Sequence, residues 1–403
     1  MEIDAGGAGF DEQRLERITD HLEANYVGPG KIAGCQALVS RRGRLAYRRS
    51  LGRRDLERDL PVTDDTIWRI YSMTKPVTGV ALLSLLERGR VALDDPVSRF
   101  LPSWRDLKVR ERGADGSERL VDPHRPMTVR DLLMHTSGLG YDARGPALLG
   151  SDADAPGNRE GATLDTIVEW LADRPLYSHP GQRWRYSVST DICGKLVEIL
   201  ADQPFDDYVR EQILDPLGMV DTGFHVPDDK VDRFAASYRR NSNKQLVLVE
   251  DPEQSAYRKP PSLPAGGSGL VSTGADYLRF CRMLLRGGEL DGTRILGPRT
   301  VEMMGMNHLP GGGDLAEFAT GGFGETGFEG MGFGLTVAVG LGPQRTQSLG
   351  TAGHYTWGGF ASTIFWVDPA EDLTVVFMTQ LIPSGTFNFR DQLKAIVYSA
   401  IVD

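Results

Sequence analysis

The sequence predicts an α/β fold in which an antiparallel β-sheet, flanked by helices, is built from both ends of the chain. Strand patterns lie near the two ends, at residues 35–51 and 334–380, whereas helical spacing dominates the middle. Short turns join the last strands, and such meander connections give antiparallel pairing. We therefore expect a sheet domain from residues 1–70 and 332–403, with a mainly helical lobe, residues 71–331, inserted between them.

The first elements follow from spacing and turn residues. Leu15, Ile18 and Leu22 recur at helical intervals, which predicts a helix from residue 11 to residue 26, ended by glycine and proline. Two strands are expected next, at 35–40 and 44–51, joined by a short turn that ends in a glycine. A short extended segment, 67–71, then leads into a helix from residue 72 to residue 86.

The middle of the chain alternates helices with turn-rich segments. Apolar residues at helical spacing predict helices at 129–134, 164–171, 191–201 and 272–285. Residues 105–126 are charged and predict a surface excursion. Residues 140–163 form a long segment rich in Gly, Asp, Pro and Ala, which is typical of a lid or binding loop. Past it, strands are expected at 334–341, 346–350, 361–368 and 373–380, and a last helix at 389–401.

The stretch Tyr71–Pro76 (YSMTKP) carries the most informative pattern. Ser72 and Lys75 are three residues apart, so on a helix they share one face. Pro76 is tolerated only in the first turn of a helix, which places Ser72 at the helix N-terminus. No charge occurs from Pro76 to Leu86, so we expect a buried helix that desolvates the Lys75 amine. A serine beside such a lysine is the pattern of an activated nucleophile.

The same two residues also fit a purely structural role. Ser72 could be an ordinary N-cap serine, with Lys75 extending past the helix start. However, only eight of the 45 basic residues are lysines, and an arginine at position 75 could not lose its proton, so the choice of lysine favours catalysis. Ser137 lies in an apparent helix stop, and Ser268 is not in a complete nucleophile elbow, because Leu270 replaces the last glycine of that motif. The seven histidines form no metal-binding pattern, so no metal site is expected.

Five blocks follow one another along the chain: Tyr71–Pro76, Leu93–Val97, Leu132–Leu139, Pro180-Gly181 before Tyr186-Ser187, and Trp357-Gly358-Gly359. In this order they resemble the serine hydrolases related to class C β-lactamases and penicillin-binding proteins, and the last block resembles the family VIII carboxylesterases in particular. They span nearly the whole chain. The resemblance implies an antiparallel sheet sandwiched by helices plus an all-α lobe, which agrees with the pattern above.

The resemblance also implies roles for individual residues. Ser72 resembles the nucleophile, Lys75 its partner on the first helix, and Tyr186 the tyrosine that completes the site. The backbone N–H groups of Ser72 and Phe360 are implied as the oxyanion hole. The residues implied around the substrate are Trp357, Gly358, Gly359, Val188, His354 and Tyr355. Without the resemblance, we would expect Tyr186 and Trp357 to be ordinary core aromatics, and a structural role is the alternative for His354.

Two departures from the β-lactamase pattern bear on the substrate. Where those enzymes carry Tyr-x-Asn, this chain has Tyr186-Ser187-Val188, and where they carry Lys-Thr-Gly it has Trp357-Gly358-Gly359. The missing Asn would bind an amide, and the missing Lys would hold the carboxylate of a drug. The remaining apolar rim suits a neutral ester.

These observations favour a serine carboxylesterase that hydrolyses short-chain acyl esters through an acyl-enzyme on Ser72, with weak or no β-lactamase activity. An acyltransferase that uses the same acyl-enzyme, or a β-lactamase or D-alanyl peptidase, are alternatives. A non-catalytic binding relative fits least, because the three residues Ser72, Lys75 and Tyr186 are intact. Whether Lys75 or Tyr186 is the formal base stays open, because the two groups titrate together.

Composition limits the partners. A formal net charge of −10 argues against binding to nucleic acid or to an anionic membrane surface, and a small-molecule ester is the expected partner. No cofactor is expected. The first residues show neither a basic nor an apolar stretch, and the three cysteines are far apart, which predicts a cytoplasmic protein with buried thiols. The sequence does not indicate an oligomeric state.

Overall fold

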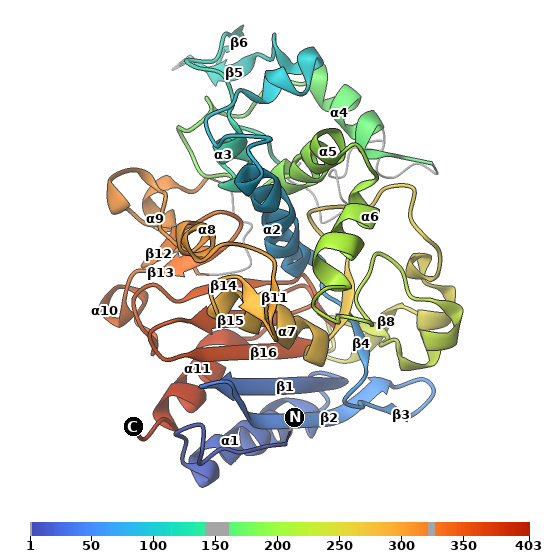
Figure 1. The fold of residues 1–403 in the computed structure, drawn as a ribbon. Coiled ribbons are helices and arrows are strands. Elements are labelled where there is room, and N and C mark those ends of the chain that lie inside the picture. Colours follow the sequence, from blue (N-terminus) through green and yellow to red (C-terminus); the bar gives the residue numbers. More distant parts are fainter. Residues whose placement is uncertain (1, 114, 142–160, 321–326) are drawn as a thin grey trace.

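A computed structural model describes residues 2–113, 115–141, 161–320 and 327–403, and an eight-stranded sheet forms its base (Figure 1). All pairings within this sheet are antiparallel. Strand β1 pairs with β16, so the two ends of the chain meet inside one sheet, and the predicted fold class is confirmed. In spatial order the strands are β12 (Met331–Phe333), β13 (Ala338–Gly340), β14 (Tyr355–Gly358), β15 (Ile364–Asp368), β16 (Leu373–Thr379), β1 (Gly34–Arg41), β2 (Arg44–Asp55) and β3 (Leu60–Pro61).

Side chains alternate across the sheet, so each face has its own hydrophobic cluster. Val39, opposite Val375 in the β1–β16 register, belongs to the cluster with the helices at the two chain ends. Leu38, opposite Val376, belongs to the larger cluster on the other face, which also contains Trp357. The helices that pack on these faces are α1 (Glu12–Leu22) and α11 (Phe389–Ser399) on the first, and α7 (Gly274–Leu285) on the second.

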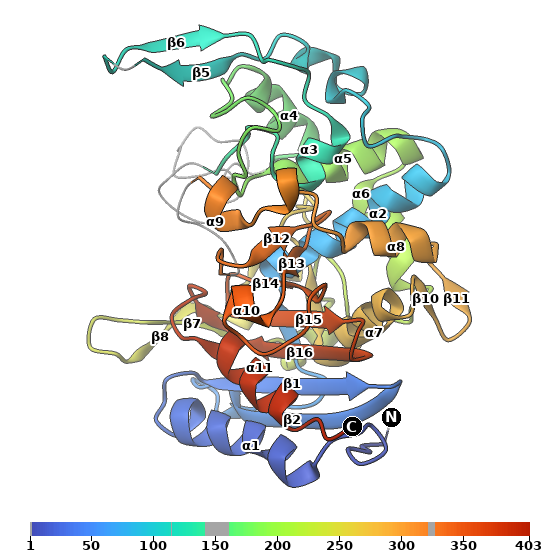
Figure 2. The same cartoon turned by 90° about the vertical axis from the view of Figure 1, so that its left-hand side faces the viewer.

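The remaining helices stand above the second face (Figures 1 and 2). Helix α2 runs through the middle of this group, and every residue from Thr74 to Leu85 is buried, as its lack of charge predicts. It packs mainly against α5. The helices of this part are α2 (Thr74–Glu87), α3 (Val129–Leu133), α4 (Leu164–Ala172), α5 (Ser189–Ala201), α6 (Phe205–Val209), α8 (Pro298–Met304) and α9 (Leu315–Phe318).

Four smaller sheets lie outside the eight-stranded sheet in the described part of the chain. The hairpin β5–β6 lies within the expected surface excursion, far from the large sheet (Figure 2). Strand β17 pairs in parallel with β7, and β4, which leads to α2, pairs with β9. The strands concerned are β4 (Ile67–Arg69), β5 (Val109–Arg112), β6 (Glu118–Val121), β7 (Ser237–Arg240), β8 (Leu246–Glu250), β9 (Val271–Thr273), β10 (Glu289–Leu290), β11 (Thr293–Arg294) and β17 (Leu381–Ile382).

Several sequence-based expectations need correction. The strand expected at 346–350 is wrong: Pro343–Thr346 form the short helix α10, and Gln347 and Gly350 have φ of 51° and 142°, which an extended strand does not allow. The strand expected at 334–341 begins only at Ala338, because Thr336 has φ of 70°.

The domain boundary expected at residue 331 stays a prediction, although one helix of the segment 71–331 packs on the sheet. Helix α7 packs against β16, β15 and β1, so this helix belongs with the sheet although it lies within the segment 71–331. Its amphipathic pattern resembles that of the other helices, and the pattern does not say which surface the apolar stripe will meet. Most of the lid-like segment 140–163 lies outside the described residues.

Cys35, Cys193 and Cys281 are buried free thiols. Among the described residues, no helix has both the length and the apolar character that crossing a membrane would require.

Candidate active site

Ser72 lies in a single 3-10 turn, Tyr71–Met73, which leads directly into α2. The side chain of Ser72 is nearly buried, and the residue before it, Tyr71, has a positive φ of 43°. Left-handed backbone is costly for a bulky residue, by roughly 1–2 kcal/mol, and such strain gathers at functional sites. The turn thus holds Ser72 at the start of the helix, where the sequence places it.

Lys75 is buried one turn further along the same helix. Its Nζ lies 2.7 Å from the carbonyl oxygen of Gly267, 3.4 Å from Ser72 Oγ and 3.5 Å from Tyr141 Oη. The Gly267 carbonyl can only accept, so Lys75 donates to it, whereas the two hydroxyls can donate or accept, so these contacts fit either the ammonium or the neutral amine.

Tyr186 joins the same cluster from the segment before α5. Lys75 Nζ lies 4.5 Å from the centre of the Tyr186 ring, and Trp357 Nε1 donates a hydrogen bond of 3.4 Å to Tyr186 Oη. The phenol oxygen therefore accepts from an indole N–H, which favours negative charge on that oxygen. The structure thus brings together Ser72, Lys75, Tyr186 and Trp357, which the sequence predicted for the site.

The end of β14 approaches the Ser72 turn closely. A Cβ atom on Gly359 would lie 2.4 Å from the carbonyl oxygen of Ile70 and 2.2 Å from Thr363 Oγ1, so only glycine fits there. The next residue, Phe360, places its ring 5.9 Å from that of Tyr71. Glycine at this position therefore lets the backbone at Phe360 lie beside the turn that carries Ser72.

Three functional candidates were missed by sequence reasoning, and they surround Lys75: Asp191, Gly267 and Tyr141. Asp191, in the first turn of α5, is buried, and its Oδ1 accepts a 2.9 Å hydrogen bond from the N–H of Gly267, the residue whose carbonyl binds Lys75. Burial raises the pKa of Asp191, and the nearby Lys75 ammonium opposes that rise. Asp191 Oδ2 is buried and has no hydrogen-bond partner among the described residues. Tyr141 is a candidate through its contact with Lys75.

His135 borders the cluster on another side. Its ring lies 4.9 Å from that of Tyr186, and its Nδ1 lies 3.1 Å from Ser187 Oγ. Burial, with a further contribution from Lys75, holds the pKa of His135 well below its usual value, so the imidazole is neutral. His135, two residues before Ser137 of the expected helix stop, is therefore also part of the wall around Tyr186. Ser187 and Ser137 both contact Ser189, and this serine network is buried.

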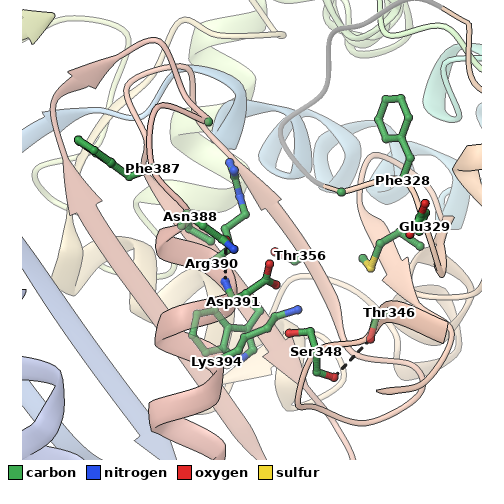
Figure 3. Close-up of a pocket in the computed structure, with 15 residues that line it drawn as sticks. Phe328, Glu329, Thr346, Ser348, Thr356, Phe387, Asn388, Arg390, Asp391 and Lys394 are labelled. Carbon is green, nitrogen blue, oxygen red and sulfur yellow. Dashed lines mark hydrogen bonds between the residues drawn. The ribbon is translucent and has the colours of Figure 1, made fainter. Parts of the chain in front are cut away.

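Trp357 is fully buried, and three other implied pocket residues lie elsewhere or in the core. His354 contacts Lys394 of α11, with 2.9 Å between its Nε2 and Lys394 Nζ, beside a cavity of about 530 Å³ that Figure 3 shows. This cavity is lined by Thr356 and Trp366, on the sheet face opposite Trp357, so the expectation that His354 lines the Ser72 pocket is wrong. The reason is the period-2 alternation around β14, which the sequence motif does not reveal.

Tyr355 and Val188 do face the α2 side of the molecule, but as core residues. The Tyr355 ring packs against Gly305 at the end of α8, and its hydroxyl has no hydrogen-bond partner among the described residues. Val188 is fully buried at the start of α5. Val188 therefore offers no exposed surface to a substrate.

Comparison with known proteins shows the family of this chain. Residues 19–398 match the model of the family described as Beta-lactamase. The chain is 34% identical to Esterase EstB of Burkholderia gladioli over 98% of each chain, and 30% identical to Monacolin J acid methylbutanoyltransferase of Aspergillus terreus (strain NIH 2624 / FGSC A1156) over 89% of this chain and 88% of that one. Among solved structures, "EstCE1, a hydrolase with promiscuous acyltransferase activity" superposes with a TM-score of 0.79 at 28% identity, covering 96% of this chain and 99% of that one. The chain therefore belongs to the beta-lactamase family and fits the family VIII esterases within it.

Proposed function

We propose that the protein is a serine carboxylesterase that hydrolyses short-chain acyl esters through a covalent acyl-enzyme on Ser72. The observation that carries the proposal is the buried cluster in which Lys75 Nζ lies 3.4 Å from Ser72 Oγ and 4.5 Å from the centre of the Tyr186 ring. A nucleophile beside groups able to accept and return its proton is what acyl transfer requires. The similarity to Esterase EstB supports the same activity.

In this mechanism Tyr186 is the base and Lys75 is its cationic partner. We assign Lys75 as the ammonium, which donates to the Gly267 carbonyl, and this charge together with the Trp357 N–H favours a phenolate at Tyr186. The phenolate takes the Ser72 proton while Oγ bonds to the ester carbonyl carbon. Tyr186 then gives that proton to the departing alcohol. A water molecule repeats the sequence, bonds to the acyl carbon and releases the acid and Ser72.

The oxyanion of each tetrahedral intermediate needs two donors. We assign this role to the backbone N–H groups of Ser72 and Phe360. The close approach of Gly359 to Ile70 supports the assignment, because it holds the end of β14 against the Ser72 turn. Donors of this kind typically contribute about 10²–10³-fold to kcat.

The apolar side chains around Tyr186 favour a neutral ester over a substrate with a carboxylate. Aromatic rings of Trp357, Trp184 and His135 enclose Tyr186, and the fully buried Val188 supplies no amide. A charge-assisted hydrogen bond lost from a β-lactam carboxylate costs about 1.5–3 kcal/mol, or roughly one to two decades in kcat/KM. We therefore expect ready hydrolysis of p-nitrophenyl acetate or butyrate and weak turnover of penicillins and cephalosporins. The test compares kcat/KM for p-nitrophenyl butyrate and nitrocefin, and equal or faster turnover of nitrocefin would favour a β-lactamase or peptidase instead.

Labelling identifies the nucleophile directly. A fluorophosphonate should add one label, and peptide mapping should place it on Ser72. Ser72→Ala should abolish the label, whereas Ser137→Ala and Ser268→Ala should retain it. Label found on Ser137 or Ser268 of the unchanged protein contradicts the assignment.

Acyl transfer to an alcohol is a second candidate function. It is favoured by the similarity to a methylbutanoyltransferase and to a hydrolase named for promiscuous acyltransferase activity. An alcohol would replace water in the second half of the reaction, with the same three side chains. Measurement of p-nitrophenyl butyrate turnover with and without a large alcohol, together with mass spectrometry of the products, separates hydrolysis from transfer.

A further inference from the structure

A second cavity is lined by residues of the β5–β6 hairpin and of the segment 177–185. The hairpin lies far from the large sheet (Figure 2). It has a volume of about 480 Å³. Five arginines line it, against a single carboxylate: Arg110, Arg112, Arg119, Arg183 and Arg185, with Glu111. The whole chain carries a net charge of −10, so this local excess of positive charge does not follow from composition.

Three of the five arginines are not neutralised by a carboxylate of the described residues. Arg119 binds Glu111, and Arg110 lies 3.8 Å from Glu118. In contrast, Arg112 and Arg183 make no ion pair with any described residue, and neither does Arg185. Like charges gathered without counter-charges repel each other, and a bound anion relieves that repulsion.

Arg185 is held in place by an aromatic ring and by its backbone. Its guanidinium lies 4.1 Å from the centre of the Tyr177 ring, a cation–π contact, and its backbone N–H donates to the carbonyl of His135. A Cβ atom on Gly140 would lie 2.7 Å from Arg185 Nε, so glycine makes room for this side chain. The ring orients the guanidinium without neutralising its charge, which is how a positioned anion-binding group is built.

The two walls of the cavity are joined firmly. The hairpin and the opposite segment exchange backbone hydrogen bonds, from Arg110 N–H to Leu176 and from Leu176 N–H to Lys108. His179 Nδ1 accepts from the backbone N–H of His124 at 3.2 Å, so the neutral ring carries its proton on Nε2, which lies 3.1 Å from Glu111. That protonated Nε2 has no lone pair for a metal, although His124, His179 and Glu111 lie close enough to resemble a metal site.

We propose that this cavity is an anion-binding site for a small molecule with carboxylate or phosphate groups, bound mainly by Arg112, Arg183 and Arg185. Planar, forked guanidinium donors match both groups, each through two parallel hydrogen bonds. Anion binding in this cavity does not require an acyl-enzyme to form on Ser72. The anion is either a free metabolite or the charged end of an ester whose carbonyl is at Ser72, and the two sources share the same chemistry.

The binding test uses calorimetry on the full chain with two probes, inorganic phosphate and citrate. The double variant R112Q/R183Q should weaken binding of the better probe by about tenfold or more, because each lost charge-assisted contact is typically worth that much. The matched control is R105Q, which removes one exposed arginine outside the cavity. Added sodium chloride should weaken binding to the unchanged protein. Equal affinity in the double variant, or no heat with either probe at millimolar concentration, overturns the proposal.

Kinetics distinguish the two sources. If the anion is part of the substrate, R112Q/R183Q should lower kcat/KM for p-nitrophenyl hemiglutarate, an anionic ester, and leave p-nitrophenyl butyrate unchanged. If the anion is free, both esters should be unaffected while probe binding is lost. An equal decrease in kcat/KM for both esters would mean that the substitutions disturb the fold, and it would contradict a role of these arginines in anion binding alone. If the esterase proposal is wrong, the unchanged protein should hydrolyse neither ester but should still bind phosphate or citrate.

Discussion

Asp191 offers the sharpest test of how the Ser72 site works. Its carboxylate binds the N–H of Gly267, and the carbonyl of the same residue binds Lys75. Asp191→Asn keeps the size of the side chain and an oxygen that can accept from Gly267, but removes the negative charge. Asp191 and Lys75 also interact through their charges. A neighbouring opposite charge typically shifts a pKa by about one to three units, so the Lys75 ammonium should become easier to deprotonate by up to that amount.

The direction of the kinetic effect follows from the proposed mechanism. If the ammonium of Lys75 supports a Tyr186 phenolate, loss of Asp191 lowers the pH at which that ammonium is lost, so the basic limb of the kcat/KM profile moves to lower pH. Each pKa unit corresponds to about 1.4 kcal/mol. If neutral Lys75 were the base instead, the acidic limb would move to lower pH. The assay is the pH profile of p-nitrophenyl butyrate hydrolysis for both proteins.

Stability should change in the opposite sense to activity. Burial raises the pKa of Asp191 in the folded protein, so the folded state binds more protons than the unfolded state between the ordinary pKa near 3.8 and the raised value. The contribution of Asp191 to the free energy of unfolding is therefore fully present at low pH and falls as pH rises through that window. Asp191→Asn should consequently unfold at the same or a higher temperature at neutral pH, while kcat/KM decreases by about tenfold or more.

A matched control is Asp276→Asn. Asp276 is also a buried carboxylate with a raised pKa, but it binds the N–H of Asp221, in a different part of the molecule. It should tolerate the substitution without a change in the pH profile. An unchanged profile in Asp191→Asn would refute the reasoning, because it would mean that Asp191 is already protonated, and so neutral, in the working protein.

Four further predictions concern the cluster and its neighbours. Ser72→Ala should lower kcat by roughly 10⁴-fold or more, measured with p-nitrophenyl butyrate, and retention of activity would exclude Ser72 as nucleophile. Lys75→Arg should be nearly as damaging as Lys75→Ala, because the larger, planar guanidinium cannot reproduce the compact ammonium among the three oxygens around it; most activity retained would make Lys75 only structural. Tyr186→Phe should fold, as judged by circular dichroism, yet give no burst of p-nitrophenol, and a normal burst would remove Tyr186 from acylation. Gly359→Ala should lower both the thermal midpoint and kcat, since its Cβ would lie 2.4 Å from the Ile70 carbonyl. The control Gly353→Ala has open space around it but replaces a glycine with positive φ, so it should lower the midpoint without a comparable loss of kcat.

The sequence predicted well those features that depend on local spacing. Ser72 and Lys75 share a helix face, and the uncharged stretch that follows them forms a fully buried helix. The sheet from both chain ends is likewise predictable, because strand patterns and short turns are local signals. The fold class and the family resemblance are confirmed by the sheet topology and by the match over residues 19–398.

Features that depend on tertiary contacts were not predictable in this way. An Asp in the first turn of a helix is ordinary, because it is favoured by the helix dipole, so nothing marks Asp191 as a neighbour of Lys75. Gly267 stands out in the sequence only as part of an incomplete nucleophile motif, yet its carbonyl binds Lys75. His354 lies near Trp357 in sequence, which suggests a place in the pocket, but the residue packs with Lys394 on the opposite face of the sheet.

The position of β14 next to the Ser72 turn has a consequence for how the protein is made. Ser72 leaves the ribosome long before Trp357 and Gly359, which follow it far along the sequence. Contacts between such distant segments form slowly, because closing the long loop between them costs entropy before the contacts can stabilise the chain. The reactive serine therefore acquires the β14 side of its site only when the C-terminal strands join β1, so a nascent or truncated chain carries the nucleophile without the completed site. Acylation by a fluorophosphonate would then report completion of the fold during translation.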